Sequence, residues 1–221
     1  MGLTLETDEL IQRLAKSARP IRPLPPPWKR TVYWLSIALP AVAAVVVLAS
    51  PRDDLAERLV DARFLIEQAA AFTTVVTAAA AAFTMVVPGQ NRTLAFLPLA
   101  PLGVWLGSLG QGWLVSWLRA GDTLKLANDW LCFPGIAITG AIPALAMMAM
   151  LRRGVPLAPR MTAMLGALAA AALGNFGLRL FHLQDASITV LIWQFGSVAL
   201  LTALNGLMGG AILGWRHAGH M

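Results

Sequence analysis

Six long apolar blocks constrain the fold of this chain more than any other feature of its sequence. Each block is long enough to cross about 30 Å of hydrocarbon as an α-helix, which takes roughly 20 residues. Inside a bilayer only helices and closed barrels satisfy every backbone polar group, and these blocks lack the alternation of barrel strands. The sequence therefore predicts an all-α, polytopic membrane protein with a six-transmembrane-helix bundle. The predicted spans are Thr31–Ser50, Gln68–Val87, Leu94–Leu118, Trp130–Leu151, Met161–Phe181 and Ile188–Trp215.

Composition and the polar N-terminus support this division of the chain. Hydrophobic residues make up 57% and charged residues 13%, whereas a soluble globular domain carries about 25% charged residues. Acidic residues and prolines precede the first block, so we expect no cleavable signal peptide. We predict two parts, a cytosolic segment over residues 1–30 and a transmembrane domain over residues 31–221. Trp28, Lys29 and Arg30 at the junction are expected among the lipid headgroups.

The distribution of basic residues predicts the orientation. An even number of spans places both termini on one side, which carries eleven Lys and Arg against three acidic residues, whereas the other side carries six against eight. The positive-inside rule therefore predicts cytoplasmic termini. The net charge of +6 follows this topology and does not indicate direct binding of nucleic acid. In the first periplasmic loop, which includes Glu67, the spacing of Leu55, Leu59 and Phe64 predicts a short interfacial helix.

The interiors of the predicted spans carry little chemistry. Lys, Asp and Glu are absent from their central turns, and Arg179 is expected to snorkel to the interface. No HExxH, GxSxG or phosphate-loop motif is present, so we expect neither an enzyme nor a cofactor. A small transporter or channel component, with the proline-kinked third and fourth spans lining a path, remains the alternative. Glycines at small-xxx-small spacing, which allow compact packing or a homodimer, are Gly103, Gly107, Gly206, Gly210 and Gly214.

A short amphipathic helix is predicted before the first span. Thr7 can cap a helix over Thr7–Arg19 whose first turn carries Asp8 and Glu9, and Pro20 ends it. The proline-rich spacer that follows can hold this helix about 20 to 25 Å from the bilayer, at roughly 3.1 Å per residue.

The apolar stripe of this helix is too small to form a core. It consists mainly of Leu10, Ile11 and Leu14, and a helix of about a dozen residues is marginal alone. Folding onto the groove of a protein partner is one interpretation. The other is a helix that lies on the inner leaflet of the lipid bilayer.

Two residues on the predicted periplasmic side could take part in sensing. Cys132, the single cysteine, lies near the start of the fourth span, and without neighbouring cations its default role is that of a small hydrophobic residue. His182 lies in the loop between the fifth and sixth spans, where a histidine is usually just solvated. If the helices bring the two side chains together, they could share a soft metal ion.

Stretches along nearly the whole chain resemble the NrsF-type membrane anti-sigma factors, negative regulators of a sigma factor that have a short cytosolic N-terminus and six spans. The matching stretches are DELIQRLAKSARPIRPLPPP at 8–27, FTMVVPGQNR at 83–92, the Cys132 region, LRRGVPLAPRMTAMLGALAAAALG at 151–174, LRLFHLQDAS at 178–187 and LIWQFGSVALLTALNGLMGGAILGW at 191–215.

The resemblance implies a function for the polar segment. It implies an anti-sigma factor of the bacterial inner membrane, whose N-terminus sequesters an extracytoplasmic-function (ECF) sigma factor until a periplasmic metal or oxidant releases it. Cys132 matches the first of two sensing positions in that family, and His182 stands at the second without the accompanying cysteine. Metal binding or a single-thiol reaction therefore remains. The residues expected to contact the sigma factor are Asp8, Leu10, Ile11, Arg13, Leu14, Arg19, Pro20, Arg22, Pro25 and Pro26.

Overall fold

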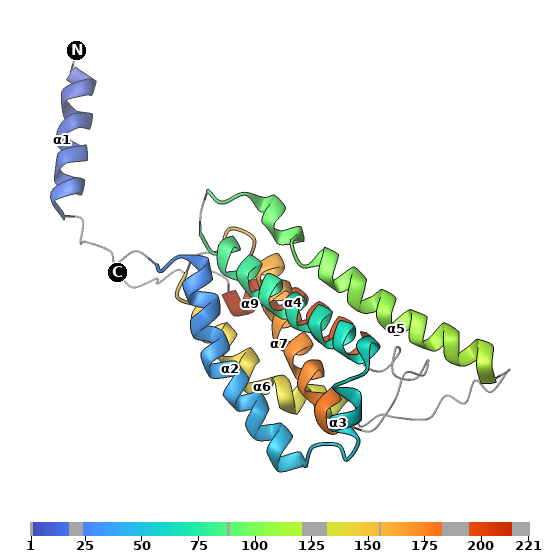
Figure 1. The fold of residues 1–221 in the computed structure, drawn as a ribbon. Helices are drawn as coiled ribbons and strands as arrows, with labels where there is room; N and C mark the ends of the chain where they lie inside the picture. The colour runs from blue at the N-terminus through green and yellow to red at the C-terminus, as the bar shows by residue number, and fades with distance from the viewer. Residues whose placement is uncertain are drawn as a thin grey trace.

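Every regular element in the described part of the computed structural model is a helix (Figure 1), which confirms the all-α prediction. The structure describes residues 2–17, 24–87, 89–120, 132–154, 156–182 and 195–213. The α-helices are α1 (Gly2–Ser17), α2 (Pro27–Ala49), α3 (Leu55–Arg58), α4 (Ala62–Met85), α5 (Leu99–Ala120), α6 (Cys132–Leu151), α7 (Pro159–Phe181) and α9 (Gly196–Leu213), and η1 (Arg92–Phe96) is a 3₁₀-helix.

Five helical segments are long and apolar enough to cross a membrane, and they correspond to the first five predicted spans. They are Pro27–Ala49, Ala62–Met85, Arg92–Gln111, Phe133–Leu151 and Pro159–Phe181. A shorter apolar helix over Gly196–Gly210 falls within the predicted sixth span, whose first residues lie outside the described part of the chain. The helices therefore support a multi-pass membrane protein.

Two of these helices begin four or more residues earlier than the apolar pattern predicts. α2 starts with Pro27 at its first position, where a fixed φ and a missing N–H suit a helix start. α4 starts at Ala62, because the Asp61 carboxylate accepts a 3.0 Å hydrogen bond from the Arg63 backbone N–H and caps the first turn. Glu67 therefore lies within a span and not, as predicted, in a loop.

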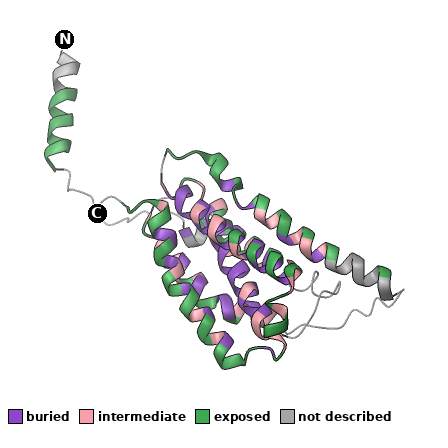
Figure 2. Ribbon diagram, viewed as in Figure 1, coloured by how far each residue is buried: buried purple, intermediate pink, exposed green. Residues whose placement is uncertain are grey.

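α7 is the centre of the bundle. It packs against α4, α6 and α9 (Figure 1). α2 packs against α6 and α4, and α5 packs along α4. In the spanning segment of α7, 72% of the residues are buried, against 22% in that of α2. Figure 2 shows the same contrast, with buried residues concentrated on α4 and α7.

Glycines and alanines let α6 and α7 approach closely. A Cβ atom added to Gly174 would lie 2.6 Å from the Ile136 carbonyl oxygen, and one added to Gly140 would lie 3.0 Å from that of Ala170. Gly206 of α9 is likewise pressed against the Met164 side chain, whereas a Cβ added to Gly103 of α5 would meet open space. Gly206 therefore serves packing within the chain, whereas a Cβ atom added to Gly210 would meet open space.

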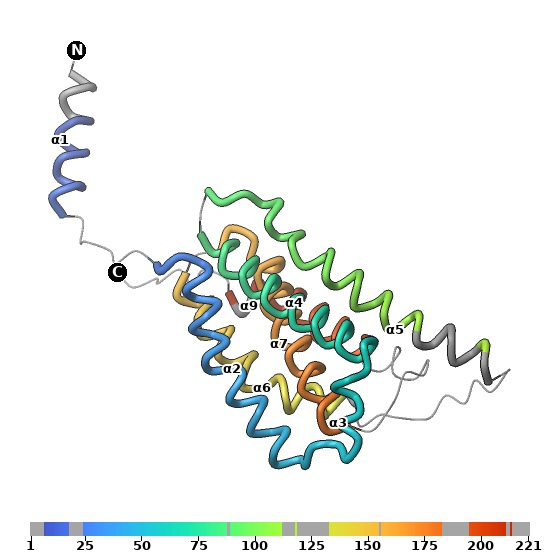
Figure 3. The backbone as a smooth tube through the Cα atoms, in the orientation of Figure 1, coloured from blue at the N-terminus to red at the C-terminus, as the bar shows by residue number. Residues whose placement is uncertain are grey.

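The bundle has two ends that are used as reference points below. The proximal end contains the start of α2, the ends of α4 and α6 and the start of α7, and the distal end contains the opposite termini of these helices. At the distal end, α2 and α4 are joined through α3, which lies beside the last turn of α7 (Figure 3). The predicted interfacial helix is thus the single turn α3, while Phe64 is buried in α4.

α1 stands apart from the bundle (Figure 1). It begins at Gly2, so the predicted N-cap at Thr7 is wrong, and Asp8 and Glu9 do not lie in its first turn. The residues between Gly2 and Thr7 include neither glycine nor proline, so the helix continues through Thr7, whereas an N-cap residue needs a non-helical backbone. The predicted end of this helix at Arg19 lies outside the described residues.

Candidate functional site

The apolar stripe of α1 is uncovered. Leu10, Ile11 and Leu14 are 57%, 57% and 61% exposed. Arg13 donates a 2.6 Å hydrogen bond to the Glu9 carboxylate one turn earlier, but both side chains are largely exposed, so this pair stabilises α1 little. A helix this short with an open apolar face gains most of its stability from a surface that covers that face.

The other residues predicted to contact a sigma factor divide into two groups. Asp8 is exposed on α1, and Pro25 and Pro26 are exposed immediately before α2. Arg19, Pro20 and Arg22 lie outside the described residues.

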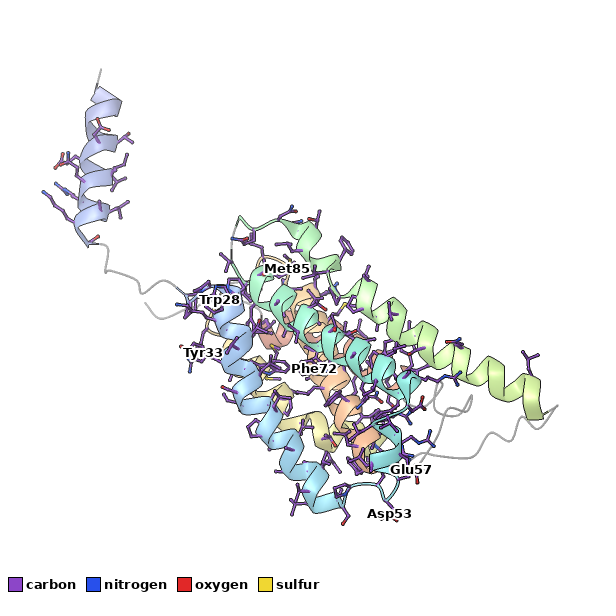
Figure 4. The ribbon with its side chains drawn as sticks, in the orientation of Figure 1. Trp28, Tyr33, Asp53, Glu57, Phe72 and Met85 are labelled. Carbon is purple, nitrogen blue, oxygen red and sulfur yellow. The ribbon has the colours of Figure 1, made fainter. Side chains whose placement is uncertain are left out.

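The end of the proline-rich spacer rests on the proximal end of the bundle. A Cβ atom added to Gly154, just after α6, would lie 3.3 Å from the Leu24 Cδ1 atom and would overlap the side chain of Val86, just after α4. Leu24 therefore lies against the loop after α6, close to the end of α4. Figure 4 shows Trp28 and Met85 at this end of α2 and α4, and Asp53 and Glu57 at the other end of the bundle.

Arg30, which the sequence pattern assigned to the lipid headgroups, is turned into the bundle and is only 3% exposed. Its Nη2 donates a 2.7 Å hydrogen bond to the Met150 carbonyl oxygen, and its Nη1 lies 3.5 Å from that of Phe83. The guanidinium also lies 4.5 Å from the centroid of the Phe83 ring. These carbonyl groups belong to the last turns of α6 and α4. Carbonyl groups at the end of a helix lack partners within that helix and attract cations.

The neighbours of Arg30 follow the headgroup prediction more closely. Trp28 and Lys29 are exposed, with the Lys29 Nζ 5.4 Å from the Trp28 ring. The difference arises from helix register, because Arg30 and Trp34 are four residues apart and share the buried face of α2. The indole of Trp34 donates a 2.9 Å hydrogen bond to the Pro143 carbonyl oxygen of α6. A helix predicted to start at Pro27 would have placed Arg30 on the buried face by this spacing.

A buried ion pair joins α4 and α7 toward the distal end. The Arg179 Nε and Nη2 atoms donate to the two Glu67 carboxylate oxygens at 2.9 and 3.1 Å. The side chains are 4% and 5% exposed. Arg179 therefore does not snorkel to the interface as predicted, because a carboxylate on the facing helix satisfies its charge inside the bundle.

A second cluster ties the α2–α3 corner to the end of α7. Arg52 donates to both oxygens of Asp54 at 2.5 and 2.8 Å and to the His182 carbonyl oxygen at 3.4 Å. Its backbone N–H donates to the Leu180 carbonyl oxygen at 3.1 Å. Hydrogen bonds from Arg52, and then from Arg58, lower the pKa of the Asp54 carboxyl well below its ordinary value. Charge and backbone bonds thus hold the distal corner together.

The two predicted sensing residues both belong to the distal end. His182 is the C-cap residue of α7, and its backbone N–H donates to the Leu178 carbonyl oxygen at 2.9 Å. Cys132 is the first residue of α6, although its side chain lies outside the description. The first turn of α6 packs on α7, because a Cβ added to Gly135 would lie 2.8 Å from the Leu178 Cδ1 atom. Among the described residues, no group of three or more His, Cys, Asp or Glu side chains could hold a metal ion.

Membrane-length helices around a central α7, together with a polar N-terminal helix outside the bundle, define a multi-pass helical membrane protein. Residues 14–215 match the family NrsF, negative regulator of sigma F, and the chain belongs to this family of sigma-factor regulators. The matched region includes the spacer, the bundle, Cys132 and His182. No match to the chain was found among curated proteins or among solved structures.

Proposed function

We propose that this chain is a membrane-anchored anti-sigma factor that holds an ECF-type sigma factor through α1 and the spacer and releases it on a periplasmic stress signal. The observation that carries the proposal is the exposed stripe of Leu10, Ile11 and Leu14 on a helix that stands apart from the bundle. A family of negative regulators of a sigma factor supplies the class of partner for that stripe.

The charge of the proximal end supports a cytoplasmic location for α1. Apart from the buried Arg30, the described basic side chains at that end are exposed, and they are Lys29, Arg92, Arg152, Arg153 and Arg160. A basic rim of this kind is typical of the cytoplasmic side of an inner-membrane protein. We therefore place both termini in the cytoplasm and the distal end, with Cys132 and His182, in the periplasm.

The cavity in the bundle does not favour the alternative of a transporter or channel component. A cavity of about 140 Å³ lies between α6, α7 and α9 and is lined almost entirely by apolar side chains. Among the described residues that line it, the one polar side chain is that of Asn205, whose amide nitrogen already donates a 2.8 Å hydrogen bond to the Leu201 carbonyl oxygen within α9. This lining offers no charge to a polar substrate.

The direct test measures binding of an ECF-type sigma factor from the same organism to the full chain in lipid nanodiscs. Leu10→Asp with Leu14→Asp places two carboxylates on the stripe, and we expect binding to weaken by about a hundredfold or more, which corresponds to about 2.7 kcal/mol. Gln12→Asp with Lys16→Gln makes the same change in net charge on the face of α1 opposite the stripe and is the matched control. Equal affinities of the two double variants would contradict the assignment of the stripe.

A further inference from the structure

Arg30 and the end of the spacer contact the same two helix ends. Arg30 bonds the last turn of α6 through Met150 and reaches the last turn of α4 through Phe83. Leu24, which precedes Arg30 by six residues, lies against Gly154, which follows α6, and close to the end of α4. The position of the spacer at the proximal end therefore depends on where the ends of α4 and α6 stand relative to each other.

The hydrogen bonds of Arg30 to the ends of α4 and α6, called the Arg30 clamp below, differ in length. The 2.7 Å bond to Met150 is short for a charged donor, whereas the 3.5 Å separation from the Phe83 oxygen is at the limit of a hydrogen bond. A displacement of α4 by a few tenths of an ångström would therefore strengthen or break the second bond. Loss of its acceptors would leave the buried Arg30 guanidinium without these hydrogen bonds, which is energetically unfavourable. An outward movement of the start of α2 would bring the guanidinium to water and relieve this cost.

α4 connects this clamp to the distal end. Glu67, paired with Arg179, lies on the same helix as Phe83 and about 24 Å from it at 1.5 Å per residue. The helix contains no proline between these residues. α6, which also runs between the two ends, contains Pro143, and proline removes a helix hydrogen bond. Of the two helices that carry the acceptors of Arg30, α4 is therefore the stiffer connection to the distal end.

We propose that Arg30 is the positioning residue that couples the distal end to the proposed sigma-binding segment. Arg30 holds the spacer on the ends of α4 and α6 in the resting state. A shift of α4 that originates at the Glu67–Arg179 pair loosens Arg30 and releases the spacer together with α1. The identity of the bound protein rests on the proposed function, whereas the clamp itself does not.

The test measures the position of the spacer directly in the full chain. Spin labels at Pro25→Cys and Leu157→Cys, in a Cys132→Ser background in nanodiscs, report the distance between the spacer and the loop before α7 by pulsed electron paramagnetic resonance. We expect a narrow distribution with Arg30 present and a broad one with Arg30→Gln. Arg30→Lys keeps the charge but loses the forked donor, and we expect an intermediate width. Lys29→Gln removes the adjacent exposed cation and is the matched control.

The link through α4 is tested by combining variants. Glu67→Gln should broaden the same distribution when Arg30 is present and should cause no further change in the Arg30→Gln chain. Equal widths for the Arg30→Gln and Lys29→Gln chains would overturn the clamp, and independent effects of Glu67→Gln and Arg30→Gln would overturn the link. If the Arg30→Gln or the Glu67→Gln chain does not fold, Arg30→Lys or Glu67→Asp replaces it in these comparisons.

Binding of the sigma factor to the same nanodiscs separates this inference from the proposed function. A chain with the native Arg30 that binds no sigma factor would contradict the proposed function while leaving the measured distances intact. A chain that binds the sigma factor but whose spacer distance does not depend on Arg30 would contradict only the present inference.

Discussion

Buried charges at both ends of the bundle are satisfied by partners that are distant in sequence. Arg179 donates hydrogen bonds to Glu67, 112 residues away, and Arg30 donates one to the Met150 carbonyl oxygen, 120 residues away. The two arginines differ in their acceptors, because one pairs with a full negative charge and the other with the partial charges of helix ends. In both cases removal of the partner leaves a cation in an environment of low dielectric constant, which is costly.

Loss of one partner of the distal ion pair should be strongly destabilising. Glu67→Gln removes the carboxylate that accepts hydrogen bonds from the buried Arg179 Nε and Nη2 atoms, and we expect the free energy of unfolding to fall by about 3 to 5 kcal/mol. Adding Arg179→Gln should recover part of this loss. Arg58→Gln, which breaks a partly exposed pair with Asp54, should cost about 1 kcal/mol or less. Denaturant unfolding in detergent micelles measures all three, and similar losses for Glu67→Gln and Arg58→Gln would contradict the burial argument.

Acid should affect the distal corner only at low pH. Because the folded pKa of Asp54 is depressed below its usual value of 3.8, its ionised form contributes stability that is fully present above that value and is lost as the pH falls through the folded pKa. The difference in melting temperature between the native chain and Asp54→Asn should therefore stay constant from about pH 7 to pH 5 and shrink below about pH 4. A difference that already shrinks near pH 6 would contradict this assignment.

At the scale of the helices, the apolar pattern predicted where the helices lie better than it predicted the residues at which they start. Apolar length predicted α2, α4, α6 and α7, but proline and aspartate at the starts of α2 and α4 extended these helices toward the N-terminus. The extension mattered because it moved Arg30 and Glu67 from the membrane surface into spans. A hydrophobicity argument cannot detect this, since both residues are individually unfavourable in lipid.

Glycine positions provide a test of packing at this scale. Gly174→Ala would bring a Cβ atom within 2.6 Å of the Ile136 carbonyl oxygen of α6, so α6 and α7 must separate, and we expect a loss of about 1 to 3 kcal/mol. Gly103→Ala places its methyl group in open space on α5 and should be neutral or slightly stabilising through helix propensity. Thermal melts in detergent compare the two, and a larger loss for Gly103→Ala would indicate that its face of α5 is covered, as in a homodimer.

At the scale of the molecule, the proposed binding helix and the predicted sensing residues belong to different parts of the chain. The uncovered helix α1 lies at one end of the polypeptide, and the predicted sensing residues Cys132 and His182 belong to the distal end of the bundle. Signalling between them requires two arrangements of the bundle that differ in their affinity for the partner. We propose α4 and Arg30 as the physical connection between the two.

Substitution at the predicted sensing positions should change the response and not the resting complex. We expect Cys132→Ser or His182→Ala to alter the induction of sigma-dependent transcription by metal or oxidant, while the sigma factor still binds in the absence of stress, because neither residue belongs to α1 or the spacer. Reporter expression with and without inducer, together with co-purification of the sigma factor, measures both properties. A normal response in both variants would refute this pair of residues as the sensor.

The sequence by itself determined the properties that depend on neighbouring residues, namely the apolar length of the spans, the bias of basic residues toward one side and the amphipathic stripe of α1. These properties follow from the transfer of single segments between water and lipid, and tertiary contacts do not change them. Only the tertiary structure decided which acceptors the buried Arg30 and Arg179 have and how the spacer lies on the bundle. The partners of these charges come from other helices, and the packing of small residues around α7 selects which helices meet.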